Sequence, residues 1–254
     1  MHRFYLPPEQ CRDAQLVLAG REAHHALHVL RVHRGEEVTV LDGAGNEFLC
    51  EVQEPGRDQI RLEVREKRWH PRPPCLITLL EAIPKGKTFE TIIQKATELG
   101  AACVVPLLSE RVEVRLKERE AIHKVEKWRA VGIEAIKQCG SAWLPKIESP
   151  VSPEQYLARK PSFDLSLVAS LQPDARHPRE YLQAAQAAGG KPQSVCVWIG
   201  PEGDFSPAEM GAIKDSGAQP MTLGRLVLRT DTAAVYCLSI LSYELGSVAA
   251  DVRL

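Results

Sequence analysis

The sequence lacks the apolar segments that mark a secreted or membrane-embedded chain. Its first residues contain no long apolar stretch of the kind found in signal peptides, and no run of about 18 apolar residues could span a bilayer. We therefore expect a cytoplasmic protein that does not enter the membrane.

Closely spaced cysteine pairs are missing as well. The seven cysteines are odd in number and widely spaced, and none forms a C-x-x-C pair, so the sequence predicts neither a disulfide framework nor a zinc site. His24, His25 and His28 are close in sequence, but adjacent histidines do not share one face of a helix. No bound metal is expected.

An excess of charge of one sign is also absent, because the 254 residues include 32 Lys and Arg against 33 Asp and Glu. This balance argues against a general polyanion binder, so any RNA site must be a local basic patch. The chain contains neither G-x-G-x-x-G nor the Walker loop that nucleotide-binding α/β enzymes need.

Prolines, by contrast, are concentrated in the segment Lys67–Pro74. Because proline fixes φ and removes a backbone donor, neither a helix nor a central strand is expected to run through this segment. We interpret it as a linker between a first domain, residues 1–70, and a second domain, residues 74–254.

Apolar and polar residues alternate before this linker. Together with the hairpin signal Asp-Gly at 42–43, they predict a small β-barrel with one helix near 22–32. The expected strands cover residues 37–41, 47–52 and 59–64.

After the linker, apolar strands alternate with helical patterns. The expected strands are 76–80, 103–106, 164–169 and 194–199, and the expected helices are 85–99, 119–138 and 179–188. This alternation predicts an α/β domain with a parallel sheet. Residues 194–199 are apolar on both faces, which is typical of a central strand.

The loop that follows this central strand is the first candidate site. Gly200 and Gly203 allow its backbone to approach a ligand closely, and such loops bind ligands in α/β sheets. Ser206, Pro207 and Glu209 then form the capping box of the next helix. A tight β-to-α turn without a ligand is the alternative.

A second candidate segment follows a short strand expected to end at Leu223-Gly224. A helix is expected to begin near 230–232, where hydroxyls and a carboxylate can cap it. It is apolar nearly all round, which predicts burial in a core or against another subunit. Arg229 beside it needs either a salt-bridge partner or a function.

These two stretches together resemble the SPOUT superfamily of S-adenosylmethionine-dependent RNA methyltransferases. Within it, the chain is most similar to the uridine-N3 methyltransferases of 16S ribosomal RNA. The similarity rests on an ordered series of motifs: His24-His25, Val29–Arg31, Gln94–Gly100, Pro106, Ser109–Arg111, Gln138–Gly140, Pro145, Gly200–Gly203, Leu223-Gly224 and Leu228–Ala233.

The resemblance implies an α/β fold, in which a trefoil-knotted SPOUT methyltransferase domain with a parallel sheet follows a small PUA-like β-barrel that binds RNA. It implies a homodimer, S-adenosylmethionine as cofactor, and methylation of N3 of one uridine in 16S ribosomal RNA of the small subunit, uridine 1498 in the family. A SPOUT methyltransferase acting on another RNA site or on a ribose 2′-oxygen is the alternative. A non-catalytic RNA-binding protein would not need the glycine-bearing loop.

The resemblance also assigns residues. Arg229 is the expected catalytic residue, because a permanent positive charge can stabilise the anionic base; Asp231 or solvent would accept the proton. The expected cofactor-binding residues are Leu171, Ile199, Gly200, Gly203, Leu223, Gly224, Leu228 and Thr230. The expected RNA contacts are Arg3, Arg31, Arg34, Lys85, Lys87 and Arg111, with Lys95 as a further candidate. The alternative for each basic residue is a solvated surface charge.

The chain departs from the family pattern at a few positions. Asp204 stands where a third glycine is common, and Asp231 stands where glutamate is usual. Lys137 occupies the place of an acidic residue, and Ser141 and Trp143 fall where many members have arginine. The loss of guanidinium groups predicts altered RNA affinity, although Trp143 could stack on a base.

Overall fold

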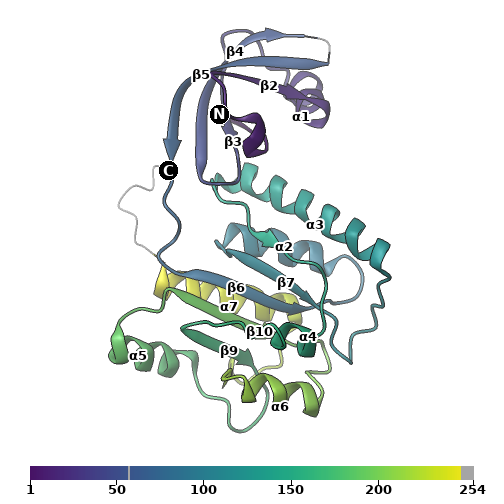
Figure 1. The fold of residues 1–254 in the computed structure, drawn as a ribbon, viewed down its shortest axis with the longest axis vertical. Coiled ribbons are helices and arrows are strands. Elements are labelled where there is room, and N and C mark those ends of the chain that lie inside the picture. The colour runs from purple at the N-terminus through teal and green to yellow at the C-terminus, as the bar shows by residue number, and fades with distance from the viewer. Residues whose placement is uncertain (57, 247–254) are drawn as a thin grey trace. The chain divides into compact units, whose positions relative to one another are not determined.

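The computed structural model describes residues 1–56 and 58–246. The chain forms two compact units (Figure 1). The first comprises residues 1–72 and 132–144, and the second comprises residues 73–131 and the chain from 145 onward. Residue 57 and residues 247–254 of the two predicted domains lie outside the described residues.

The first unit contains a five-stranded sheet with the order β1-β3-β4-β5-β2, in which β1 and β3 are parallel and the other pairs are antiparallel. These strands are β1 His2–Tyr5, β2 Gln15–Ala19, β3 Glu37–Leu41, β4 Asn46–Pro55 and β5 Gln59–Trp69. Their inward side chains, with those of the helical segment after β2, form one apolar core. Apolar and polar residues alternate along these strands because one face of the sheet is buried.

Two predictions for the first unit need correction. β5 continues to Trp69, paired with Asn46 of β4, so the linker does not begin at residue 67; the interruption starts with the prolines at 71, 73 and 74. The expected single helix near 22–32 is a short α1, Gly20–His24, followed by a π-helical segment, His25–Leu30.

Residues 132–144 belong to the first unit although they follow the proline-rich segment by some distance in sequence. They include the end of α3, Glu118–Cys139. Trp143 donates from its indole nitrogen to the carbonyls of His70 and Pro71, and the guanidinium of Arg72 lies 4.1 Å from its ring centroid. The ring therefore holds residues 70–72 of the proline-rich segment, and its stacking on a base stays a prediction.

The second unit is built on a six-stranded sheet with the order β11-β9-β10-β6-β7-β8, in which every pair is parallel. Its strands are β6 Leu76–Ala82, β7 Cys103–Leu107, β8 Lys146–Ile147, β9 Leu165–Ala169, β10 Ser194–Ile199 and β11 Gln219–Met221. The central strand β10 is buried along nearly its whole length, as its apolar sequence predicts.

Helices cover both faces of this sheet (Figure 1). The apolar core on one face is formed with α2, α5, α7 and the first part of α3, and the core on the other face with α4 and α6. The bounds are α2 Thr88–Glu98, α4 Pro153–Leu157, α5 Pro178–Gly189, α6 Pro207–Asp215 and α7 Thr230–Leu245. The predicted α/β domain with a parallel sheet is thus confirmed.

One strand ends earlier than expected. β11 stops at Met221 instead of Leu223-Gly224, and residues 222–229 are irregular up to the start of α7. The side chain of Thr222 accepts a hydrogen bond from the backbone N–H of Gly224, and Gly224 has φ +112°. The chain therefore turns out of the sheet at this point, in a conformation that favours glycine.

Candidate functional site

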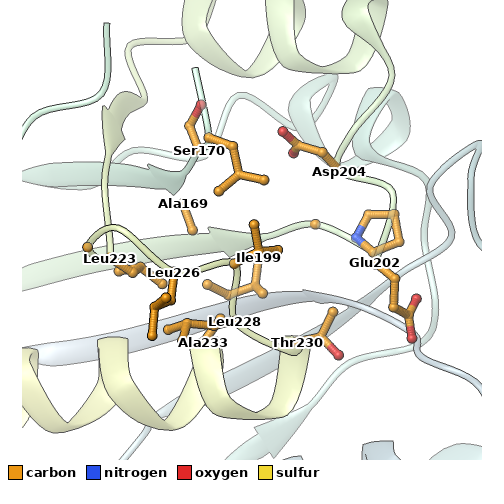
Figure 2. Close-up of a pocket in the computed structure, with 15 residues that line it drawn as sticks. Ala169, Ser170, Ile199, Glu202, Asp204, Leu223, Leu226, Leu228, Thr230 and Ala233 are labelled. Atoms are coloured by element: carbon orange, nitrogen blue, oxygen red, sulfur yellow. The ribbon is translucent and has the colours of Figure 1, made fainter. Parts of the chain in front are cut away.

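Three chain segments meet at the carboxyl ends of β9, β10 and β11. Because neighbouring parallel strands end at the same edge, the segments after them, 169–171, 199–204 and 223–230, surround one cavity (Figure 2). The cavity holds about 580 Å³ of space free of protein atoms, part of it open to solvent. A mostly apolar lining with a few polar groups is typical of a site for a small organic molecule.

The wall of the cavity is apolar on one side and acidic on the other. Figure 2 shows Leu223 and Leu226 on the apolar side, opposite Glu202 and Asp204. The remaining lining residues are Ala169, Ser170, Leu171, Ile199, Gly200, Pro201, Gly224, Val227, Leu228, Thr230 and Ala233. Such a wall fits a ligand that combines a flat apolar ring with positive charge.

The loop after β10 is tightly folded. A Cβ at Gly200 would approach the Asp204 carboxylate and Phe205 to 3.2 Å. Asp204 has φ +62°, its N–H donates to the carbonyl of Pro201 at 2.8 Å, and its carboxylate accepts the N–H of Phe205 at 2.7 Å. A left-handed backbone explains why glycine is common here and why aspartate is tolerated.

The predicted capping box at the start of α6 is present. Ser206 accepts the N–H of Glu209 at 3.3 Å, and the Glu209 carboxylate accepts the N–H of Ser206 at 2.9 Å. The same carboxylate accepts hydrogen bonds from the Ser109 hydroxyl and the Glu110 N–H, both at 2.9 Å. The segment after β7 is thereby attached to the loop after β10.

The expected side-chain cap of α7 is wrong. Arg229 occupies the N-cap position and makes no capping hydrogen bond with its side chain. The Asp231 carboxylate instead accepts the N–H of Thr232 at 2.9 Å, which is a local contact inside the first turn. The helix therefore begins without a capping side chain at its N-cap position, next to the cavity-lining residue Thr230.

A buried carboxyl group lies next to this site. Glu81, at the end of β6, is paired in register with the cavity-lining Ile199, and its side chain has no exposed surface. Neither of its carboxyl oxygens has a hydrogen-bond partner among the described residues. Burial raises the pKa of this carboxyl well above its usual value, and the negative charges of Asp231 and Glu202 raise it further. The carboxyl is therefore neutral at pH values where exposed glutamates are ionised.

Sequence reasoning did not single out Glu81, although a signal was present. It is the one charged residue in the otherwise uncharged segment 76–83 that forms β6 and its end. A charge inside a buried strand needs an explanation. The acidic wall residues Glu202 and Asp204 were also not predicted as ligand contacts.

Comparison with known proteins identifies the family to which the chain belongs. A family model described as an RNA methyltransferase domain matches residues 71–242, and one described as an RNA methyltransferase PUA domain matches residues 18–65. Ribosomal RNA small subunit methyltransferase E of Bacillus subtilis is 31% identical over 248 residues, which are 96% of this chain and 97% of the relative. The chain belongs to this methyltransferase family.

Other members are similar over comparable lengths. The Synechocystis ribosomal RNA small subunit methyltransferase E is 30% identical and aligns over 97% of this chain and 78% of its own. A Legionella pneumophila protein, described as a methyltransferase and solved with bound S-adenosylmethionine, is 32% identical with a TM-score of 0.87, covering 97% of this chain and 98% of its own. The Neisseria gonorrhoeae methyltransferase E bound to S-adenosylmethionine is 26% identical with a TM-score of 0.84, covering 98% and 100%.

The family's expected cofactor residues converge here, with one exception. Seven line the cavity: Leu171, Ile199, Gly200, Leu223, Gly224, Leu228 and Thr230. Gly203 does not line it, because it lies on the outer side of the loop, where its carbonyl accepts a hydrogen bond from Arg111. Arg229 is exposed and does not line the cavity, although its two neighbours in sequence, Leu228 and Thr230, both do.

The residues expected to contact RNA divide between the units. In the first unit, Arg3 donates to the carbonyls of Lys137 and Gln138 at the end of α3, whereas Arg31 and Arg34 are exposed. In the second unit, Lys85 pairs with Glu113 at 2.5 Å, Lys95 pairs with Glu98 at 2.7 Å, and Lys87 is exposed. Three of these groups therefore have protein partners, as Arg111 has, and their RNA contacts stay predictions.

The described residues contain neither a metal-binding cluster nor a membrane-spanning helix. No group of three or more His, Cys, Asp or Glu side chains is placed to hold a metal ion in the part of the chain that is described. Within the same part, no helix is long and apolar enough to cross a membrane.

Proposed function

We propose that the protein transfers a methyl group from S-adenosylmethionine to N3 of a uridine in 16S ribosomal RNA, at the position numbered 1498 in the family. The convergence of the predicted cofactor residues on one cavity carries this proposal. Family membership supports rRNA methylation, and two relatives whose structures hold S-adenosylmethionine support the cofactor. The N3 atom and the position rest on the sequence resemblance.

The cavity fits S-adenosylmethionine chemically. The leucines and Ile199 can bury the adenine ring, and the loop backbone around Gly200 can hydrogen-bond to its edge. The carboxylates of Glu202 and Asp204 favour the positive charge of the cofactor, which has a sulfonium and an ammonium group. When bound, the cofactor supplies a methyl group that is already activated for transfer.

The protein must then orient the uracil and manage the charge on it. N3 is a weak acid, so transfer is favoured when its proton is removed or the resulting anion is stabilised. Arg229 lies at the rim of the cavity between two lining residues, where its permanent charge can stabilise that anion. Asp231, two residues after Arg229, or solvent accepts the proton. Because N3 is hidden in a base pair, the target is unpaired or flipped out.

The resemblance further supports a trefoil knot, formed where the segments around the cavity pass one another, and a homodimer. Tyr236 and Tyr243 are exposed on one side of α7, with the half-buried Ile240 on the same helix face, and Leu226 and Val227 are exposed beside the cavity. A second copy of the chain would cover this apolar surface and bring its own residues near the cavity.

The first unit is proposed to bind the RNA, together with basic residues of the second unit, because a PUA domain model matches it. A cytoplasmic location is proposed as well, because the proposed substrate is ribosomal RNA, free or within the small subunit.

The decisive experiment maps methylated nucleotides by mass spectrometry in 16S ribosomal RNA from cells without the protein. The expected result is the loss of one base methyl group on a uridine, which returns when the purified protein and S-adenosylmethionine are added. A returning ribose methyl group, or a modified nucleotide in another RNA, would support the alternative reaction. No change in any RNA would contradict the proposal.

A further inference from the structure

The segment that follows β7 holds the outer side of the loop that forms one wall of the cavity. The hydroxyl of Ser109, which is 3% exposed, and the N–H of Glu110 both donate to the Glu209 carboxylate. The guanidinium of the next residue, Arg111, donates to the carbonyl of Gly203. Two consecutive attachments therefore join residues about 100 positions apart in the chain.

The Gly203 carbonyl lies between two residues that line the cavity, Glu202 and Asp204. Gly200, Pro201, Glu202 and Asp204 line the cavity, whereas Gly203 faces away from it. Asp204, the next residue, has a left-handed backbone that a non-glycine residue adopts only at an energetic cost. A hydrogen bond to the carbonyl of Gly203 restrains the peptide unit just before Asp204, and so the direction in which Glu202 and Asp204 present their carboxylates.

We propose that Arg111 is a positioning residue for the cofactor, in place of the RNA phosphate contact expected from its charge. Its role rests on the proposed function, because the loop that it holds is the one proposed to bind S-adenosylmethionine. The guanidinium keeps the loop in its binding conformation before the cofactor arrives, so that less conformational freedom is lost on binding.

The side chain's surroundings favour this role over a phosphate contact. A Cβ built at Gly203 would lie 3.7 Å from Cδ of Arg111, so the aliphatic part of the side chain also packs on the loop. Arg115, four residues later, is exposed and makes no hydrogen bond or ion pair with the described residues. It is a natural comparison, because it carries the same charge in the same segment without touching the loop.

The test measures cofactor and RNA binding separately, with the full-length protein. Calorimetry without RNA gives the Kd for S-adenosylmethionine of wild type, Arg111→Met, Arg111→Lys and the control Arg115→Met. We expect Arg111→Met to bind about tenfold more weakly, since a charged hydrogen bond is lost. The Kd of Arg111→Lys, which can still donate one hydrogen bond, should lie between those of wild type and Arg111→Met. Arg115→Met should bind the cofactor as wild type does. Turnover should show a higher KM for the cofactor with kcat unchanged.

The salt dependence of RNA binding separates the two roles. The salt slope is the change in the logarithm of the RNA-binding constant with the logarithm of the salt concentration. If Arg111→Met binds the cofactor as wild type does but its salt slope is smaller in magnitude by about one, then Arg111 is a phosphate contact and the proposal is wrong. Should Arg111→Met not fold, an Arg111→Lys protein with wild-type affinity and KM overturns the proposal equally. A folded wild-type protein that binds no S-adenosylmethionine would instead contradict the proposed function itself.

Discussion

The ammonium group of Lys137 lies 2.8 Å from a carboxylate oxygen of Glu22, although the two residues are separated by 115 positions in the chain. The side chains are only 7% and 14% exposed, so this ion pair is largely shielded from water. Glu134 contributes a second carboxylate at 3.1 Å, and Glu22 also accepts the N–H of Tyr5. Lys137, which departs from the family pattern, thus has both of its carboxylate partners within the first unit.

Removing one partner of this pair should destabilise the protein. Lys137→Met leaves the carboxylate of Glu22 shielded from water without its counter-charge, and we expect a loss of about 3 kcal/mol in the free energy of unfolding. Urea denaturation measures this loss. In the double variant Glu22→Gln/Lys137→Met, at least half of it should be recovered, because the shielded carboxylate of Glu22 is gone, while Glu134 is 40% exposed and keeps Arg21 at 3.3 Å. A Lys137→Met protein as stable as wild type would show that the pair contributes nothing.

The contact between Gly45 and Trp143 predicts a steric effect. A Cβ at Gly45 would lie 2.5 Å from Cζ2 of the indole, and the residue also has φ +99°. Gly45→Ala should therefore cost about 1–3 kcal/mol in unfolding free energy beyond the cost of a left-handed alanine. Gly35→Ala is the matched control, because Gly35 has φ +82° but no atom within 4 Å of the added Cβ. Equal losses in the two variants would contradict the steric argument.

The buried Glu81 predicts a pH-dependent stability difference. Its pKa is raised in the folded protein by burial and by the carboxylates of Asp231 and Glu202. The folded state therefore binds a proton that the unfolded state releases, so stability falls as the pH rises above the ordinary glutamate pKa of about 4.3. The same carboxyl also contributes to the raised pKa of the Cys237 thiol, whose largest cause is burial.

Glu81→Gln removes this titration. We expect the variant to gain stability relative to wild type between pH 5 and 8, by up to about 1.4 kcal/mol for each pH unit, until the folded-state pKa is reached. Urea denaturation at several pH values gives the comparison, with Glu9→Gln, an exposed glutamate, as control. A stability difference that does not change with pH would show that Glu81 is ionised in the folded state.

Replacing Arg229 should affect methyl transfer but not the binding of S-adenosylmethionine. Because its side chain does not line the cavity, Arg229→Ala should bind S-adenosylmethionine with unchanged affinity. Methyl transfer should fall by about a hundredfold or more, since the stabilising charge on the anionic base is lost. Calorimetry and single-turnover assays measure the two quantities. Arg225→Ala, an exposed arginine of the same segment, should retain activity. Wild-type turnover in Arg229→Ala would remove Arg229 from the reaction.

Local patterns predicted much of the second unit. The apolar runs of β6, β7, β9 and β10, and the capping box of Ser206 and Glu209, depend on residues near in sequence, so their signals are present in the chain itself. β8 and α4 escaped prediction because two- and five-residue elements carry little periodicity. The contacts of Lys137 and Trp143 were not predicted, because their partners, Glu22 and Arg72, lie far away in sequence.

Motifs and apolar runs read along the chain were enough to indicate the family, the alternation of strands and helices, and most residues of the cavity, because glycine positions and apolar runs constrain the backbone locally. Which side of the loop faces the cavity follows from the packing of distant segments, so that Gly203 turns outward to Arg111 while Glu202 and Asp204 line the wall. The same packing buries Glu81 beside the site, where its carboxyl has no hydrogen-bond partner among the described residues. Such facts depend on which distant segments pack together, and spacing along one chain does not encode them.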